Sequence, residues 1–248
     1  MSWKWKLILI IALAGNIFFL IKAIEYRNGA NDWRDRYAHI VQEFSGREKY
    51  EKDNQRYFNS QSDRRVVFFG TQVVGRWDLG RSFPEYEAIN RGIYGQWAAG
   101  LLLRFKPDVI DLKPRAVVIE ISSYNLRPQY SLREIEDYVI SMVDLARANN
   151  ITPILSTMIP LQKDAQINME GLTNFEIRDS ILTYNSWLID YCVRAGTHYV
   201  DFNKPLSDTN GNLSAKLSDG PIDPNPNGYK LMSSAVKSIL DSLLIPNK

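Results

Sequence analysis

The chain has 248 residues, of which 45% are hydrophobic and 23% are charged. This composition is ordinary for a globular protein and excludes wholesale disorder, and the length accommodates one sizeable α/β domain with an appendage. Its 30 basic and 28 acidic residues leave a formal net charge of only +2. Because no domain-wide basic field is available to hold a polyanion, we expect no nucleic-acid partner.

The chain has few residues that could bind a metal ion or form a disulfide. Cys192 is the single cysteine, so an internal disulfide is excluded, and its helical core spacing predicts a small buried hydrophobe. The two histidines are His39 and His198, and together with one cysteine they do not supply a zinc-type ligand cluster. We therefore expect neither a metal ion nor a cofactor.

The N-terminal segment predicts a membrane anchor. Residues Leu7 to Ile24 are apolar apart from Asn16 and Lys22. A helix over this span is roughly 27 Å long, just enough to cross a bilayer if Lys22 snorkels to the interface. Trp3 and Trp5 stand where interfacial aromatic side chains belong.

Positive charge ahead of the span sets the expected orientation. Lys4, Lys6 and the α-amino group precede the apolar run, which places the bulk of the chain across the membrane. A cleaved signal peptide is the rival interpretation. Cleavage after the one A-x-A pattern, Ala12-Leu13-Ala14, would leave too short an apolar core, and Ile21 is a poor substitute for the small residue that cleavage requires. An uncleaved signal anchor over residues 1–24 is favoured.

A charged stem over residues 25–63 follows the anchor and precedes a globular domain over residues 64–248. An amphipathic helical stripe runs through the stem, formed by Trp33, Tyr37, Ile40, Val41 and Phe44. The stripe either packs back on the domain or forms a surface for a partner. The first interpretation is the safer one, because most such stripes complete a core.

Strands and helices alternate through the globular part. The predicted strands are Val66–Phe69, Glu87–Asn90, Ala116–Ile121, Pro153–Ile159 and Tyr199–Phe202. The predicted helices begin at a capping box from Ser131 to Glu134, cover Ile177–Cys192 with Gly196 as the stop, and run from Asn227 to Leu244. This order demands a parallel sheet with helices on both faces.

In such a sheet, ligands bind at the carboxyl ends of the strands. The sequence places five segments there: Gly70–Gln72, Asn90–Gly95, Ser122–Asn125, Ile159–Pro160, and the loop from Phe202 up to Asp223.

Four of these regions resemble sequence blocks of the SGNH/GDSL hydrolases. Val66–Gln72, followed by Arg76–Leu79 and Phe83–Pro84, is similar to the first block, in which a strand ends in Gly-Asp-Ser or Gly-Ser-Ser. Ile89–Gly95 resembles the second block, Lys113–Asn125 the third, and Asp219–Tyr229 the fifth, with Asp219 as its leading aspartate. The resemblance covers roughly Arg65 to Leu244 and implies a three-layer α/β/α, flavodoxin-like SGNH-hydrolase fold with a parallel sheet, here preceded by a transmembrane helix and a helical stem.

The resemblance also implies where the catalytic residues would stand, and most of them are replaced. The family's nucleophilic serine falls on Gln72, whose amide cannot attack a carbonyl, and Thr71 precedes it. The histidine falls on Asp223. Nucleophile and base are therefore both absent from their family positions.

The oxyanion-hole positions are only partly kept. The family's asparagine falls on Tyr124 in the simplest register, or on Asn125 if the register slides by one residue. Gly95 is the clearly retained signature residue. His198, at the start of the last strand and at the opposite edge of the sheet, and His39, in the stem, are not credible replacements for the family's histidine.

A catalytically inactive scaffold that binds a ligand is the first hypothesis. Gln72, Gly95, Asn125 and Asp223 would line a polar pocket, and amides with a carboxylate suit hydroxyl-rich or acylated ligands such as envelope glycans. The second hypothesis is a rewired esterase or acyl-transfer enzyme acting on envelope glycans or lipids.

In the rewired enzyme, the nucleophile would be Thr71, Ser122 or Ser123, and the base would be Asp223 or Asp219. An unperturbed Asp, with a pKa of about 3.9, is poorly matched to a hydroxyl. A third hypothesis is a structural docking subunit of an envelope assembly, with the anchor and stem as contact surfaces. The expected setting for all three is a bacterial inner membrane, crossed once, with the domain on the periplasmic side.

Overall fold

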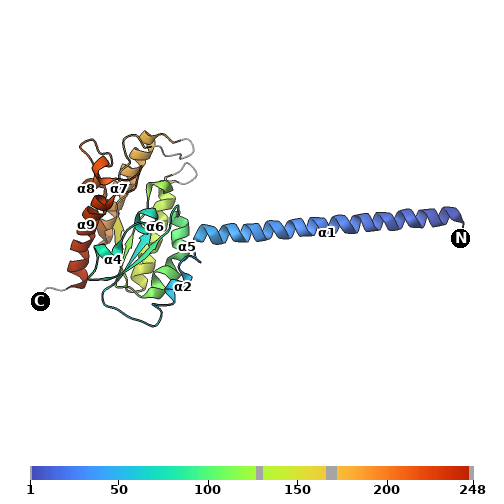
Figure 1. Ribbon diagram of the computed structural model, residues 1–248, viewed down its shortest axis with the longest axis horizontal. Helices are drawn as coiled ribbons and strands as arrows, with labels where there is room; N and C mark the ends of the chain where they lie inside the picture. The colour runs from blue at the N-terminus through green and yellow to red at the C-terminus, as the bar shows by residue number, and fades with distance from the viewer. Residues whose placement is uncertain (1, 127–130, 166–171, 246–248) are drawn as a thin grey trace. The chain divides into compact units, whose positions relative to one another are not determined.

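The structure is a computed structural model that describes residues 2–126, 131–165 and 172–245, without the side chains of residues 35–43. It divides into two compact units, Met1–Glu43 and Phe44–Lys248, which are described separately. The ribbon is drawn in Figure 1.

The first unit consists of most of helix α1 (Trp3–Ser45). Its stretch Trp3–Arg34 has a mean hydropathy of 2.5 over its most apolar window and is long enough to cross a membrane. Side chains such as Ile11 and Phe19 are exposed, as befits a membrane anchor or a signal sequence. The helix runs without a break from the predicted anchor into the predicted stem. Most of the apolar stripe (Tyr37, Ile40 and Val41), like His39, lies outside the described side chains.

The second unit is built on one five-stranded parallel sheet. Its strands are β1 (Arg65–Gly70), β2 (Glu87–Gly92), β3 (Ala116–Ile119), β4 (Thr152–Ser156) and β5 (His198–Val200), in the order β2-β1-β3-β4-β5. All residues of β1 and β3 are buried, as expected of central strands covered on both faces. The predicted α/β fold with a parallel sheet is confirmed.

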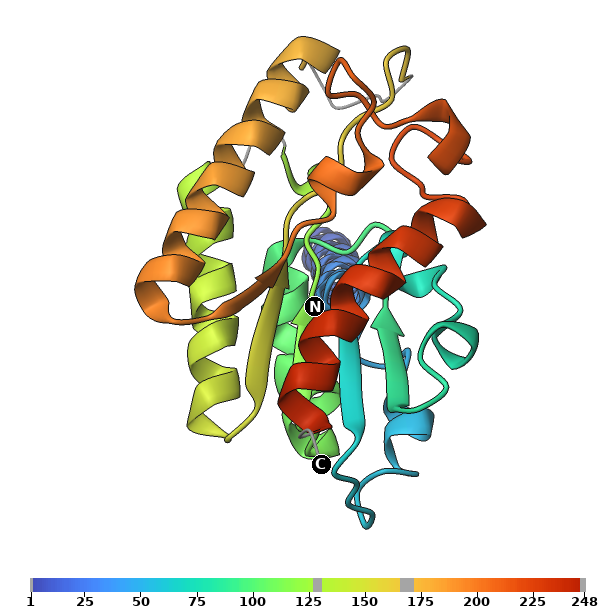
Figure 2. The ribbon, with the colours of Figure 1, turned by 90° about the vertical axis from the view of Figure 1, so that its left-hand side faces the viewer.

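Helices cover both faces of this sheet (Figure 2). Helices α5 (Ala98–Asp108), α6 (Leu132–Ala148) and α7 (Asn174–Ala195) pack in series on one face, and α9 (Pro226–Leu244) crosses the other. The short helices are α2 (Glu51–Asn54), α3 (Gln72–Gly75), α4 (Leu79–Ser82), α8 (Asn203–Leu206) and the 3-10 turns η1 (Ile110–Leu112), η2 (Ser123–Asn125) and η3 (Ala215–Leu217).

Local sequence signals explain where the long helices begin and end. The predicted capping box at Ser131 is present, with the Ser131 hydroxyl accepting from the backbone of Glu134 and the Glu134 carboxylate accepting in return. Thr173 forms a second capping box ahead of α7, and Gly196 ends that helix with a left-handed φ of 59°. Cys192 is buried in α7, as its spacing predicts.

An aromatic cluster fixes α9 against the loop that follows β1. Trp77 is buried, lies 5.7 Å from Phe83 and 5.4 Å from Tyr229 between ring centroids, and donates from its indole nitrogen to Ser82 and Ser233. Trp77 and Phe83 are therefore loop anchors packed on the core. The cluster sets the position of the fifth-block residues relative to the first block.

The compact unit begins earlier than the expected start at residue 64, because residues just after α1 pack on the sheet. The Tyr50 hydroxyl donates a 2.6 Å hydrogen bond to the carbonyl of Gly92. Asn54 is buried and bridges two elements, donating to Asp108 and accepting from Arg91. Much of the expected stem thus belongs to the globular unit.

Candidate functional site

The carboxyl edge of the sheet brings three of the predicted segments together. Gly70, at the end of β1, pairs with Gly92 at the end of β2, and the backbone N–H of Glu120 donates to the carbonyl of Phe69 across β1 and β3. The turn that carries Thr71 and Gln72 therefore lies between the second and third blocks, as the resemblance implies.

The turn after β1 is tied down by a buried carboxylate. Oε2 of Glu120 accepts a 2.7 Å hydrogen bond from the Thr71 backbone N–H and one of 2.8 Å from the Thr71 hydroxyl. Burial raises the pKa of the Glu120 carboxyl to about 7, and the two hydrogen bonds from Thr71 oppose that rise. Glu120 thus faces neither solvent nor Arg115, the two surroundings that a charged residue on a central strand would suggest.

Gly70 is required by this arrangement. A Cβ at Gly70 would lie 2.6 Å from Oε2 of Glu120 and 2.8 Å from the Glu120 carbonyl oxygen. The strand can therefore approach the carboxylate only because residue 70 lacks a side chain.

Gln72, on which the resemblance places the family's nucleophile, is only 2% exposed. Among the described residues, neither its Oε1 nor its Nε2 has a hydrogen-bond partner. The hydroxyls of Ser122 and Ser123, at the end of β3, are likewise buried without a partner in the described part of the chain. Buried polar atoms nearly always have a hydrogen-bond partner. The unpaired donors and acceptors at this edge of the sheet are therefore unusual.

A buried arginine, Arg104, fixes the same edge of the sheet to a helix. Arg104, in α5, pairs with Asp108 at 2.8 Å and donates to the carbonyls of Gly70 and Arg91. Its Nε donates to the side chain of Gln96. Arg104 is fully buried, and burial lowers the pKa of its guanidinium, which Asp108 opposes. The ends of β1 and β2 are therefore fixed to α5 by charge-assisted hydrogen bonds.

The two candidates for the family's asparagine differ in orientation. The Asn125 side chain is turned toward backbone: its Oδ1 accepts a 2.6 Å hydrogen bond from the N–H of Ala98, and its Nδ2 faces the carbonyls of Gln96 and Ser122. Asn125 is buried, whereas Tyr124 is half-buried at the rim. Asn125 thus holds the start of α5 and is not directed into an open pocket.

Gly95, the retained signature glycine, is exposed and has a φ of 69°. A Cβ there would meet no atom within 4 Å, so the requirement for glycine comes from the left-handed backbone and not from crowding.

Asp223, on which the resemblance places the family's histidine, forms an ion pair with Arg76, with Oδ1 3.2 Å from Nη1. The Arg76 side chain is 52% exposed and that of Asp223 16% exposed. The other predicted acid, Asp219, is exposed, and its backbone N–H donates to the carbonyl of Asp223. The Asp223 carboxylate is therefore engaged by Arg76.

A groove of about 830 Å³ adjoins this ion pair, between the loop after β1 and α9. Arg76, Asp219, Asn227 and Tyr229 belong to its lining. Among the predicted site residues, Asp219 therefore borders an open space, while Gln72 and Asn125 lie beneath the surface.

The described residues contain no cluster of three or more histidine, cysteine, aspartate or glutamate side chains that could hold a metal ion. His198 is exposed at the beginning of β5, the end of the strand opposite the site, as predicted. Among the described residues, His198 therefore does not supply a base beside Gln72.

Sequence reasoning missed Glu120 and Arg104, the two charged groups that organise the turn. For Glu120 the signal was present, because an acidic residue interrupts an apolar run on a central parallel strand and must find a buried partner. Arg104 carried no comparable signal, since an arginine in an amphipathic helix is usually solvated.

Three comparisons with known proteins agree with this geometry. The family model described as GDSL-like Lipase/Acylhydrolase matches residues 69–231. Among solved structures, a GDSL-like lipase from Bacteroides thetaiotaomicron is similar with a TM-score of 0.72 and 24% identity, covering 80% of this chain and 98% of that one. An acetylxylan esterase from Geobacillus stearothermophilus, Axe2, is similar with a TM-score of 0.56 and 20% identity, covering 72% and 94%.

A curated relative is also similar over part of the domain. An uncharacterised lipoprotein of Bacillus subtilis, YqeF, is 30% identical over 119 residues, which cover 39% of this chain and 49% of the relative. The match thus spans about half the length of that relative. The family model matches well over half of the chain, so the chain belongs to the GDSL-like lipase/acylhydrolase family.

Proposed function

We propose that this protein is a membrane-anchored, catalytically inactive member of its family that binds a hydroxyl-rich or acylated glycan at the carboxyl edge of its sheet. The observation that carries the proposal is Gln72. Its amide replaces the nucleophile and keeps both polar atoms unpaired within the described protein. An unpaired buried polar group costs about 1–3 kcal/mol, so a role for this donor and acceptor is expected.

Loss of the base supports the same proposal. Asp223 stands where the histidine would be, and its Oδ1 lies 3.2 Å from Nη1 of Arg76. The groove beside it offers hydroxyl and amide groups from Ser233 and Asn227. Such groups make directional hydrogen bonds to sugar hydroxyls.

The comparisons support the ligand class and the setting. Axe2 is titled an acetylxylan esterase, so an acetylated polysaccharide is the first ligand to test. YqeF is named a lipoprotein, and α1 contains an apolar stretch long enough to span a bilayer, which supports an inner-membrane protein with its domain on the periplasmic side. Lys4 and Lys6 ahead of the span favour that orientation.

The test uses the full chain in lipid nanodiscs. Ester hydrolysis is measured with p-nitrophenyl acetate and butyrate, and binding of acetylated xylo-oligosaccharides is measured by calorimetry. We expect no turnover above background. We also expect a Gln72→Leu variant to bind the oligosaccharide at least about tenfold more weakly while remaining as stable as the wild type, because leucine removes two unpaired polar atoms at similar volume.

Turnover that disappears in an Asp223→Ala variant would overturn the proposal and establish a site around that carboxylate. Unchanged affinity in Gln72→Leu would overturn the binding role of Gln72.

A threonine-dependent esterase is the second candidate, because the Thr71 hydroxyl already donates to a carboxylate at 2.8 Å and the pKa of that carboxyl is raised to about 7. Thr71 is fully buried and Gln72 is 2% exposed, so burial does not separate the two candidates. Turnover lost in both Thr71→Val and Glu120→Gln, but kept in Asp223→Ala, would establish this candidate.

A further inference from the structure

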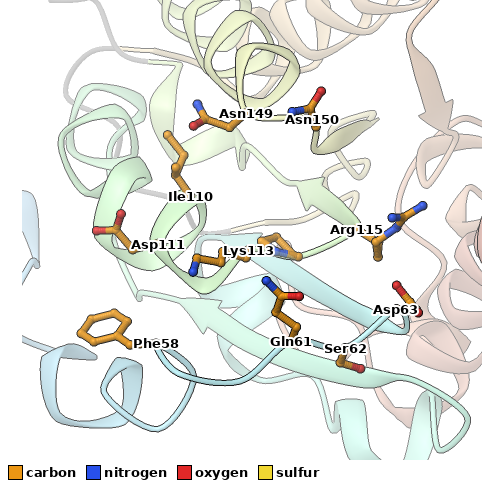
Figure 3. Close-up of a pocket in the computed structure, with 11 residues that line it drawn as sticks. Phe58, Gln61, Ser62, Asp63, Ile110, Asp111, Lys113, Arg115, Asn149 and Asn150 are labelled. Carbon is orange, nitrogen blue, oxygen red and sulfur yellow. The ribbon is translucent and has the colours of Figure 1, made fainter.

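A groove at the amino edge of the sheet lies away from the candidate site at the carboxyl edge (Figure 3). It has a volume of about 660 Å³ and lies between the chain that leads into β1, the turn between η1 and β3, and the end of α6. Because β1, β3 and β4 are neighbours in the sheet, these three segments meet where the strands begin.

Backbone strain is concentrated in this groove. Within the described residues, Lys113 and Asn150 are the two non-glycine residues with positive φ, at 51° and 58°, and both line it. Asparagine tolerates the left-handed region, but a lysine there costs about 1–2 kcal/mol that glycine would avoid. Backbone strain of this kind, at a position where glycine would be unstrained, clusters at ligand-binding sites.

The groove lining carries two cations, Lys113 and Arg115, and two acids, Asp63 and Asp111. Lys113 and Arg115 are exposed, and neither has an ion-pair partner among the described residues. Of the acidic lining residues, Asp111 is already engaged by Lys106, which leaves Asp63. Two unpaired cations facing one open space favour an anionic group.

The remaining lining is suited to a sugar. Figure 3 shows Phe58 at one end, Arg115 at the other, and Gln61 and Lys113 between them. Phe58 is 42% exposed and offers an apolar ring, while the side chain of Gln61 carries both a donor and an acceptor. An aromatic face, amides and a pair of cations in an elongated groove match a saccharide chain that bears carboxylates.

We propose that this amino-edge groove binds an acidic oligosaccharide, with Lys113 and Arg115 engaging its carboxylates and Phe58 packing on a neighbouring ring. The site is independent of the carboxyl edge. The Lys113 ammonium group binds the ligand, which accounts for a lysine in this strained turn.

The experiment measures calorimetric binding of a galacturonic-acid tetrasaccharide to the full chain in nanodiscs, with a galactose tetrasaccharide of the same linkage as the neutral control. We expect the acidic probe alone to bind, and its affinity to fall as salt is raised. Arg115→Ala and Lys113→Gly should each weaken binding by about tenfold or more, the effect expected for one lost charge-assisted hydrogen bond.

Lys113→Gly separates a binding role from a structural one, because glycine relieves the left-handed backbone. Its thermal midpoint should equal or exceed that of the wild type while its affinity falls. Asp223→Ala should bind the acidic probe normally, which keeps this test distinct from that of the carboxyl edge. Equal binding of both probes, no binding of the acidic one, or unchanged affinity in both groove variants would overturn the inference.

Discussion

The hydroxyl and the backbone N–H of Thr71 both donate to one oxygen of Glu120, at 2.8 and 2.7 Å. This relationship fixes the turn at which the family's nucleophile would stand, and it does so with a carboxylate that is fully buried and has no basic partner among its hydrogen bonds. The stability of this turn is therefore expected to depend on pH.

Glu120→Gln should raise the stability of the domain at alkaline pH. Burial raises the pKa of Glu120 from 4.5 to about 7, so the native state binds a proton more tightly than the unfolded chain does. The free energy of unfolding then falls as pH rises between these values, by about 3 kcal/mol. Glutamine keeps an oxygen for both hydrogen bonds and does not ionise.

Urea unfolding of both proteins at pH 5 and pH 8 checks this prediction. The variant should be more stable by about 3 kcal/mol at pH 8 and nearly equal to the wild type at pH 5. A difference that stays constant across this range would show that Glu120 does not titrate there.

Gly70→Ala should destabilise the domain by about 1–3 kcal/mol, because the new methyl group would overlap the Glu120 side chain and backbone. Gly80→Ala is the matched control, since a Cβ there meets only Asp78 Oδ1 at 3.8 Å and the residue lies in a helix. Denaturation midpoints are compared. Equal stability of the two variants would mean that β1 and Glu120 can separate without loss.

Arg104→Met should cost about 3–5 kcal/mol of unfolding free energy, because it leaves Asp108 buried without its cation. An Arg104→Met, Asp108→Leu double variant should recover a large part of that loss, since neither charge of the pair is then left buried without its partner. Lys106→Ala, which removes an exposed ion pair with Asp111, should cost less than about 1 kcal/mol. A double variant less stable than the single one would contradict this account.

Asn125→Ala should destabilise the domain by about 1–2 kcal/mol, since the N–H of Ala98 at the start of α5 loses its acceptor. Affinity for an acetylated oligosaccharide should change little in this variant, because the Asn125 amide faces backbone. A strong loss of affinity with unchanged stability would instead place Asn125 in the binding site.

The sequence alone determined the order of strands and helices, the helix caps at Ser131 and Gly196, and the positions of the family's blocks. These features rest on local signals, namely apolar periodicity, capping chemistry and short motifs, which a linear chain carries in full. Its resemblance to the family also predicts that Gln72 and Asp223 stand at the catalytic positions, a prediction that needs residue identities and no coordinates.

Only the tertiary structure decided what those residues do. Whether Asn125 points into a pocket or toward backbone, and whether Asp223 is paired with Arg76, depends on contacts between segments far apart in the chain. The same holds for Glu120, whose partner lies 49 residues away, and for Lys113, whose left-handed backbone is invisible in an amino-acid identity. Side-chain direction, burial and strain arise from packing, which is non-local, so they are absent from any reading of the sequence taken one segment at a time.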